Sequence, residues 1–225
     1  MRFLTALVIA CQLPVSAYAD ELRLAVIANN ATHEGLWSVV EEAARRAGLT
    51  VSAHAMPAER GMLQASQYDL DGAAGRTTVM AQGYPALVRV DEPVYQYAPT
   101  AYTYRRFDVT AGWQALAGHT VCIRRGLKLT EERTRGLPRQ ELRDESSMLR
   151  MLRAGGCDVA VMDRHNAVAK AAMAADARLL QLQPPLERIP LYLYLNDHHA
   201  HQAPRLAEAL RKMRADGAMQ RLGSE

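Results

Sequence analysis

The sequence predicts an α/β protein of two lobes, each a mainly parallel sheet flanked by helices, with two crossing strands joining the lobes. Strand-like and helix-like patterns alternate twice in the order βαβα, which favours parallel sheets covered by helices. Two long extended segments, one after each alternating unit, would carry the chain out of the first lobe and back again. The length of 225 residues, 49% of them hydrophobic, suffices for two small lobes and excludes large multidomain assemblies.

The first nineteen residues have the pattern of a secretory signal. Arg2 provides a positive start, an apolar stretch follows, and Ala17-Tyr18-Ala19 fits a small-x-small cleavage site. We therefore expect residues 1–19 to be a signal peptide and the mature protein to be soluble and periplasmic. Acylation at Cys11, as in a lipoprotein, is an alternative, although the apolar stretch before this cysteine is short.

The first alternating unit follows this signal directly. Its first strand-like segment turns at Asn29 and Asn30, and the next segment has apolar residues at spacings of three and four until Gly48. A second helical segment starts with a proline in its first turn. The expected elements are a strand over 22–27, a helix over 33–47, a strand over 50–54 and a helix over 57–67.

The second unit repeats this order after a tyrosine-rich extended segment at 92–104. An alternating segment at 189–196 and a closing helix at about 203–222 come after it. The expected elements between them are a strand over 120–123, a helix over 146–154, a strand over 158–162 and a helix over 166–175. We therefore expect lobe 1 to comprise residues 20–100 and 191–225, and lobe 2 to comprise residues 101–190.

Removal of the signal leaves two cysteines, Cys122 and Cys157. An oxidising compartment favours a disulfide between them. Both lie within apolar strand-like runs, however, where a free cysteine is also stable as a small buried hydrophobic residue. The sequence leaves these two states open.

The composition argues against several functional classes. The net charge is only +3, from 27 basic and 24 acidic residues, and no basic run is long enough for a nucleic-acid partner. Nucleophile-elbow, CxxC, phosphate-loop and zinc-protease motifs are missing from the sequence, so we expect neither an enzyme nor a cofactor. Asp163 and His165 could form an acid–base pair, but seven histidines produce such pairs by chance.

An ordered set of motifs covers essentially the whole mature chain. The motifs are Leu22–Val26, Tyr68–Gly72, Leu116–Ile123 and Leu152–Asp163, followed on the closing helix by Leu206, Leu210, Met213, Asp216 and Gly217. Together they resemble periplasmic solute-binding protein family 3, which has the type II periplasmic-binding fold. A subgroup of unassigned ligand is the most similar, through Asp71-Gly72-x-x-x-Arg76 and Tyr84-Pro85.

The resemblance implies a monomeric receptor for an ABC-type importer. Its lobes would close by a hinge motion on a small polar ligand, anionic or zwitterionic and amino-acid-like. Its partner would be a membrane permease or a sensor. A ligand-sensing or maturation accessory protein is the alternative function, and a dehydratase-like enzyme is less favoured. Ligand contacts would lie beyond the carboxyl ends of the strands. The candidate ligand-binding residues are Asn29, Asn30, Arg76, Thr77, Tyr97, Arg125 and Asp163.

Within this set, two residues would bind the charged groups of the ligand. Arg76 would grip an anion, and Asp163 matches the family position that pairs with an ammonium group. Each also has a structural interpretation, as an exposed arginine and as a helix cap respectively. Asn29 and Asn30 could likewise turn the chain and cap the next helix.

Two departures from the family pattern bear on the ligand. Thr78 is not followed three residues later by the arginine that amino-acid binders of the family use as a carboxylate clamp. Leu127 stands where the family commonly has a hydroxyl side chain. We expect Arg76 and Arg125 to compensate, although an ion pair of Arg125 with Glu131 or Glu132 is an equal alternative.

One cluster has the chemistry of metal ligands, since imidazoles and a carboxylate suit zinc or copper. It consists of Asp197, His198, His199 and His201, between an expected strand and the closing helix. In the family this position is a solvated turn. We therefore expect no metal site.

Overall fold

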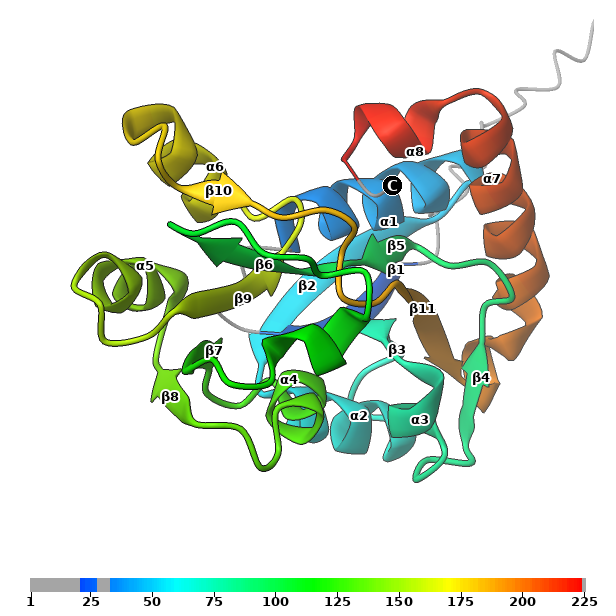
Figure 1. Ribbon diagram of the computed structural model, residues 1–225. Coiled ribbons are helices and arrows are strands. Elements are labelled where there is room, and N and C mark those ends of the chain that lie inside the picture. Colours follow the sequence, from blue (N-terminus) through cyan, green and yellow to red (C-terminus); the bar gives the residue numbers. More distant parts are fainter. Residues whose placement is uncertain (1–20, 28–32, 224–225) are drawn as a thin grey trace, which may run out of the picture.

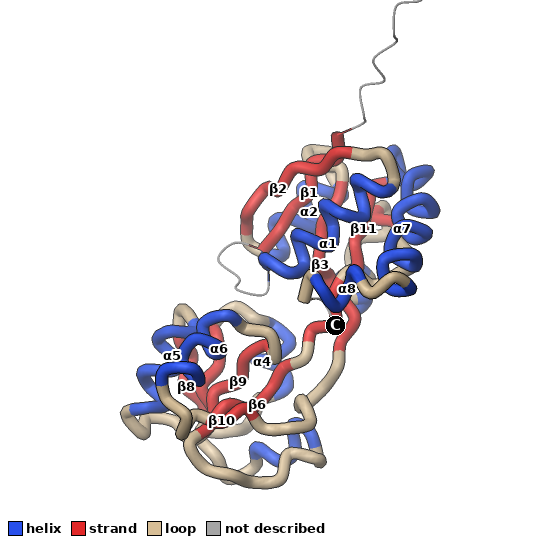
Figure 2. Tube along the Cα trace, turned by 90° about the horizontal axis from the view of Figure 1, so that it is seen from above, coloured by secondary structure: helices blue, strands red, loops and turns tan. Residues whose placement is uncertain are grey.

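The computed structural model describes residues 21–27 and 33–223. The expected signal peptide, and the ligand contacts expected at Asn29 and Asn30, lie outside the described residues. Over those described ranges, no helix combines the length and the apolar character needed to cross a membrane. The chain forms two bodies, each with its own sheet, and Figure 2 shows them joined by extended chain segments.

The first sheet has the strand order β2-β1-β3-β11-β4, with β5 paired to β11. Strands β2, β1 and β3 are parallel, whereas β11 runs antiparallel to β3, β4 and β5. The strands are β1 (Glu21–Ile27), β2 (Thr50–Met56), β3 (Gly72–Arg76), β4 (Leu87–Arg89), β5 (Tyr95–Tyr97) and β11 (Ile189–Asn196).

Helices cover both faces of this sheet (Figure 1). The period of two along β1 sends Leu22 and Leu24 into a core with α1 and α7, and sends Ala25 to the opposite face, where Met62 of α2 packs. The helices are α1 (His33–Arg46), α2 (Ala58–Ser66), α3 (Thr78–Ala81), α7 (Ala203–Ala215) and α8 (Ala218–Arg221).

The second sheet has the order β10-β6-β9-β7-β8. Its β7, β8 and β9 are parallel, and β6 is antiparallel to both β9 and β10. Helices α5 and α6 pack on one face. The elements are β6 (Pro99–Thr103), β7 (Val121–Arg124), α4 (Lys128–Arg133), β8 (Arg139–Leu142), α5 (Glu145–Arg153), β9 (Val159–Asp163), α6 (Ala167–Ala175) and β10 (Leu180–Gln181).

On the α5 face of this sheet, Cys122 and Cys157 are joined by a disulfide. This resolves the alternative that the sequence left open. Cys122 lies on β7, and Cys157 lies just before β9, so the bond closes a loop with a sequence separation of 35 residues. It therefore fastens the two central parallel strands of the second sheet to each other.

The two-sheet α/β architecture agrees with the predicted fold class, although each sheet contains antiparallel as well as parallel strand pairs. The closing helix also differs from the expectation. The expected helix at 203–222 is two helices, α7 and α8, separated at Gly217. Gly217 has φ +74°, a left-handed conformation that glycine adopts without steric cost and that ends an α-helix. The chain leaves the first sheet between β5 and β6 and returns to it along β11.

Candidate functional site

Asp163, the last residue of β9, is a buried carboxylate with one oxygen left without a partner. Its side chain is 3% exposed. Oδ1 accepts hydrogen bonds from the Tyr95 hydroxyl at 3.0 Å and from the His165 amide at 2.8 Å, whereas Oδ2 has no hydrogen-bond partner within the described chain. Burial raises the pKa of Asp163 to about 6. Oδ2 is therefore placed to accept a hydrogen bond from a cationic donor.

The structural alternative for Asp163 was that it caps the following helix. That cap is instead Asn166, whose side-chain oxygen accepts a hydrogen bond from the Ala169 amide at 2.9 Å. The alternative is therefore wrong for α6, and the Asp163 carboxylate turns instead towards Tyr95 and its own loop.

Tyr97 lies close to Asp163 and to an ion pair of the second sheet. Burial is the main cause that raises the pKa of Tyr97, and the Asp163 carboxylate is the second. The charge of Glu145 raises this pKa further, and the charge of Arg124 lowers it. Arg124 and Glu145 are both buried and pair at 3.0 Å between Nη1 and Oε1. Tyr97, which lies on β5 of the first sheet, is therefore within electrostatic reach of charged residues of the second sheet: Asp163, Arg124 and Glu145.

Sequence reasoning selected Arg125 and missed Arg124. Arg125 is exposed and donates a hydrogen bond to the Glu141 carbonyl at 3.3 Å. The alternation along β7 did not distinguish the two arginines, because all four residues of the strand are buried. Arg124 is held in place by Glu145 at the start of α5, which is distant in sequence.

Arg76, the last residue of β3, is buried inside the first body. It is 1% exposed, so the alternative of an exposed arginine is wrong. Nη1 donates to the Ala74 carbonyl at 2.5 Å and Nη2 to the Ala25 carbonyl at 3.5 Å, while Nε is buried without a partner. No carboxylate of the described residues forms an ion pair with it, and burial lowers the pKa of Arg76 to about 10.

A glycine in α2 makes the space for this guanidinium. A Cβ atom at Gly61 would lie 3.1 Å from Nη2 of Arg76 and 2.8 Å from Cβ of Ala25. The helix therefore approaches the sheet closely at this residue. The neighbouring candidate, Thr77, is the N-cap of α3 and accepts a hydrogen bond from the Met80 amide at 3.3 Å.

We expect Arg76→Met to stabilise the fold. Methionine has a similar length and removes a buried charge without an ionic partner, so the free energy of unfolding should rise by about 1–3 kcal/mol. Urea denaturation measures this as a higher midpoint at an unchanged slope. Arg125→Met is the matched control, because that arginine is exposed and should alter the midpoint little. A lower midpoint for Arg76→Met would contradict the expectation.

The histidine segment after β11 makes structural contacts. His198 stacks on Tyr68 with ring centroids 4.4 Å apart, and Nε2 of His199 lies 3.5 Å from Asp71. Asp71 is already held by Arg23, through its amide at 2.8 Å and its guanidinium at 3.1 Å. Within the part of the chain that the structure describes, no three histidine, cysteine or acidic residues gather as metal ligands would.

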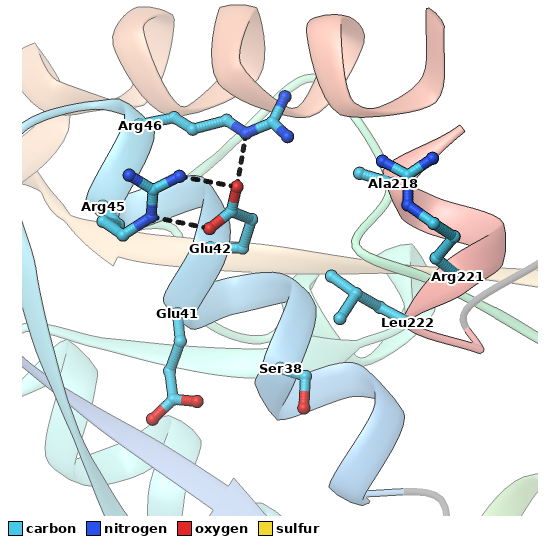
Figure 3. Close-up of a pocket in the computed structure, with 8 residues that line it drawn as sticks. All are labelled: Ser38, Glu41, Glu42, Arg45, Arg46, Ala218, Arg221 and Leu222. Carbon is cyan, nitrogen blue, oxygen red and sulfur yellow. Dashed lines mark hydrogen bonds and ion pairs between the residues drawn. The ribbon is translucent and has the colours of Figure 1, made fainter. Parts of the chain in front are cut away.

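Two surface concavities lie away from Asp163 and Arg76. One, of about 380 Å³, lies between α1 and α8, where Glu42 pairs with Arg45 and Arg46 (Figure 3). Arg46 also pairs with Asp216 at 2.6 Å, so these charges tie α1 to the end of α7. The other, of about 650 Å³, lies on the second body beside Trp113.

No protein-family model and no curated protein matches the sequence. Among solved structures, a mutant of ArgBP from T. maritima has a TM-score of 0.66 and 16% identity over 90% of this chain and 93% of that one. An ancestral arginine-binding protein bound to arginine has a TM-score of 0.66 and 14% identity, covering 90% and 96%. A histidine kinase sensor domain with similarity to periplasmic binding proteins has a TM-score of 0.64 and 17% identity, over 89% of this chain and 93% of that one. These likenesses show that the chain has the two-lobe, type II periplasmic-binding fold that the sequence predicted.

Proposed function

We propose that this protein is a solute-binding protein that captures a small zwitterionic, amino-acid-like ligand between its two lobes. The main support for the proposal is that, in each sheet, one strand ends at a buried ionisable residue that has no ionic partner among the described residues. These are Arg76 on the first sheet and Asp163 on the second. A ligand with a carboxylate and an ammonium group supplies one partner for each.

The energetics favour such a ligand. A buried charge is costly unless it is paired, so an ammonium group on Oδ2 of Asp163 would recover part of the cost of burying that carboxylate. Arg76 would have to turn from the Ala25 carbonyl, which its Nη2 contacts at only 3.5 Å, to meet the ligand carboxylate. Solved neighbours described as bound to arginine and to glutamine support this ligand class.

We propose residues 1–19 as a cleaved signal peptide, a periplasmic location, and lobes of residues 20–100 with 191–225 and of residues 101–190. The mature protein would act as a monomer and deliver its ligand to an ABC-type permease. Tyr97, Thr77 and Arg125 remain proposed orienting residues, with Arg124 added because it is buried beside Tyr97.

A thermal-shift series on the mature protein tests the zwitterion. L-arginine and L-glutamine at a hundred times their dissociation constant would add about 2.7 kcal/mol of stability, which raises Tm by about 5–10 °C for a chain of this size. Agmatine lacks the carboxylate of arginine, and N-acetyl-arginine lacks its free ammonium group, so both should shift Tm far less. Equal shifts with all four compounds, or no shift with any amino acid, would refute the proposal.

A sensory role is the second candidate, favoured by the likeness to a histidine kinase sensor domain. Deletion of the gene distinguishes the importer role from the sensor role. Deletion of an importer component abolishes uptake of the radiolabelled ligand, whereas deletion of a sensor leaves uptake intact and abolishes a transcriptional response to that ligand. Uptake that is unchanged in the deletion strain would therefore favour the sensor.

A further inference from the structure

The side chain of Tyr95 connects the two sheets through Asp163. Tyr95 lies on β5, pairs with Leu191 of β11 in the first sheet and is 2% exposed. Its hydroxyl donates to Oδ1 of Asp163, which ends β9 of the second sheet. The two residues are 68 positions apart in sequence, at the place where the chain passes from one sheet to the other.

The two oxygens of the Asp163 carboxylate differ in their hydrogen bonds. Oδ1 accepts from Tyr95 and from the His165 amide, and Oδ2 has no partner within the described chain. A second tyrosine, Tyr102, holds the main chain instead, because its hydroxyl donates to the Asp163 carbonyl at 3.0 Å and accepts from Gln181 at 2.7 Å. Of these two tyrosines, Tyr95 alone binds the charged group of Asp163.

We propose that Tyr95 is a positioning residue for Asp163: its hydroxyl occupies Oδ1, ties the carboxylate to the strand between the sheets, and leaves Oδ2 for the ligand cation. This assignment rests on the proposed solute-binding function. A hydrogen bond to a carboxylate favours its ionised form. Tyr95 therefore offsets part of the effect of burial, which raises the Asp163 pKa to about 6.

The pH dependence follows from this geometry. Ligand affinity should rise with pH as Asp163 ionises, through about pH 6. His165, whose amide binds Oδ1 of Asp163, is also titratable, and burial lowers its pKa. The pH dependence of binding alone would therefore not assign the effect to Asp163. The titratable and charged groups around the pair are Tyr97 on β5, Tyr102 on β6, Arg124 on β7, Glu145 on α5, Arg164 and His165 after β9, Lys170 on α6 and Arg188 before β11.

Carbon-13 NMR of aspartate-labelled, ligand-free protein tests the assignment directly. Asp163→Asn identifies the Asp163 carboxyl resonance by removing it. In Tyr95→Phe, which retains the buried ring, the pKa of Asp163 should rise by about one pH unit, because one hydrogen bond to the charged form is lost. Tyr102→Phe is the matched control. It removes an equally buried hydroxyl that binds the main-chain carbonyls of Asp163 and Arg164 and the side-chain amide of Gln181, so the Asp163 pKa should stay unchanged.

Binding of L-arginine supplies the functional half of the test. Near pH 6.5 the affinity of Tyr95→Phe for L-arginine should be about threefold below that of the wild type. The difference in affinity should narrow at pH 8.5, where Asp163 is ionised in both proteins. An Asp163 pKa that is the same in Tyr95→Phe and the wild type overturns the assignment, whatever the protein binds. If the pKa moves but no amino acid binds to the wild type, the Tyr95 contact is supported and solute capture is refuted.

Discussion

Asp163→Asn is expected to abolish most ligand affinity and, at neutral pH, to stabilise the empty protein. The loss of the charged acceptor should weaken binding of a cationic group about a hundredfold. The gain in stability has a separate cause. The folded-state pKa is about 6 and the ordinary value is 3.8, so the unfolded chain ionises more easily than the folded one.

The sign of this linkage sets the pH window. Because the folded pKa is raised, the stabilising contribution of protonated Asp163 is fully present below about pH 4 and is lost as the pH rises through 6. Asparagine is never ionised, so the variant should exceed the wild type by about 1–3 kcal/mol at pH 7.5 and by far less at pH 4.

Urea midpoints at the two pH values measure this effect. Asp176→Asn is a control of opposite sign, because Arg178 pairs with Asp176 and lowers its pKa to about 2. That variant should be slightly less stable than the wild type at pH 7.5. Retained affinity for arginine in Asp163→Asn would exclude this carboxylate as the cation contact, and a loss of stability at pH 7.5 would contradict the burial argument.

Removal of the disulfide is expected to have the largest effect on stability. The bond closes a loop with a sequence separation of 35 residues, and its loss should lower the free energy of unfolding by about 4 kcal/mol through the entropy of the unfolded chain. Cys122 and Cys157 are both buried, so the double alanine variant also tests packing between β7 and α5. The measurement is the urea midpoint with and without dithiothreitol.

The reductant distinguishes the bond from the packing. Dithiothreitol should lower the midpoint of the wild-type mature protein towards that of Cys122→Ala/Cys157→Ala and leave the midpoint of the double variant unchanged. Alkylation without reductant, followed by mass measurement, should add nothing to the wild type. A mass increase of two alkyl groups would show free thiols and contradict the expected bond.

Much of the fold could be predicted because it follows from local patterns. Spacings of three and four residues placed α1, alternation placed β11, and the apolar run before Asp163 placed β9 with that carboxylate at its end. The strand β3 was missed, because Gly72-Ala73-Ala74-Gly75 has no β-branched or aromatic residue. Its small residues reflect close neighbours: a Cβ at Gly72 would lie 2.2 Å from the carbonyl oxygen of Tyr194.

The sequence by itself determined the strands β1, β2, β7, β9 and β11, the helices α1, α2, α5 and α6, and the position of Asp163 at a strand end, because these depend on residues near one another in the chain. Tertiary structure alone decided that Arg76 is buried beneath Gly61, that Arg124 rather than Arg125 is buried, and that Tyr95 reaches Asp163. Each of these outcomes depends on which faces of separate elements pack together. Periodicity along one segment carries no information about the partner that a distant segment will bring to it.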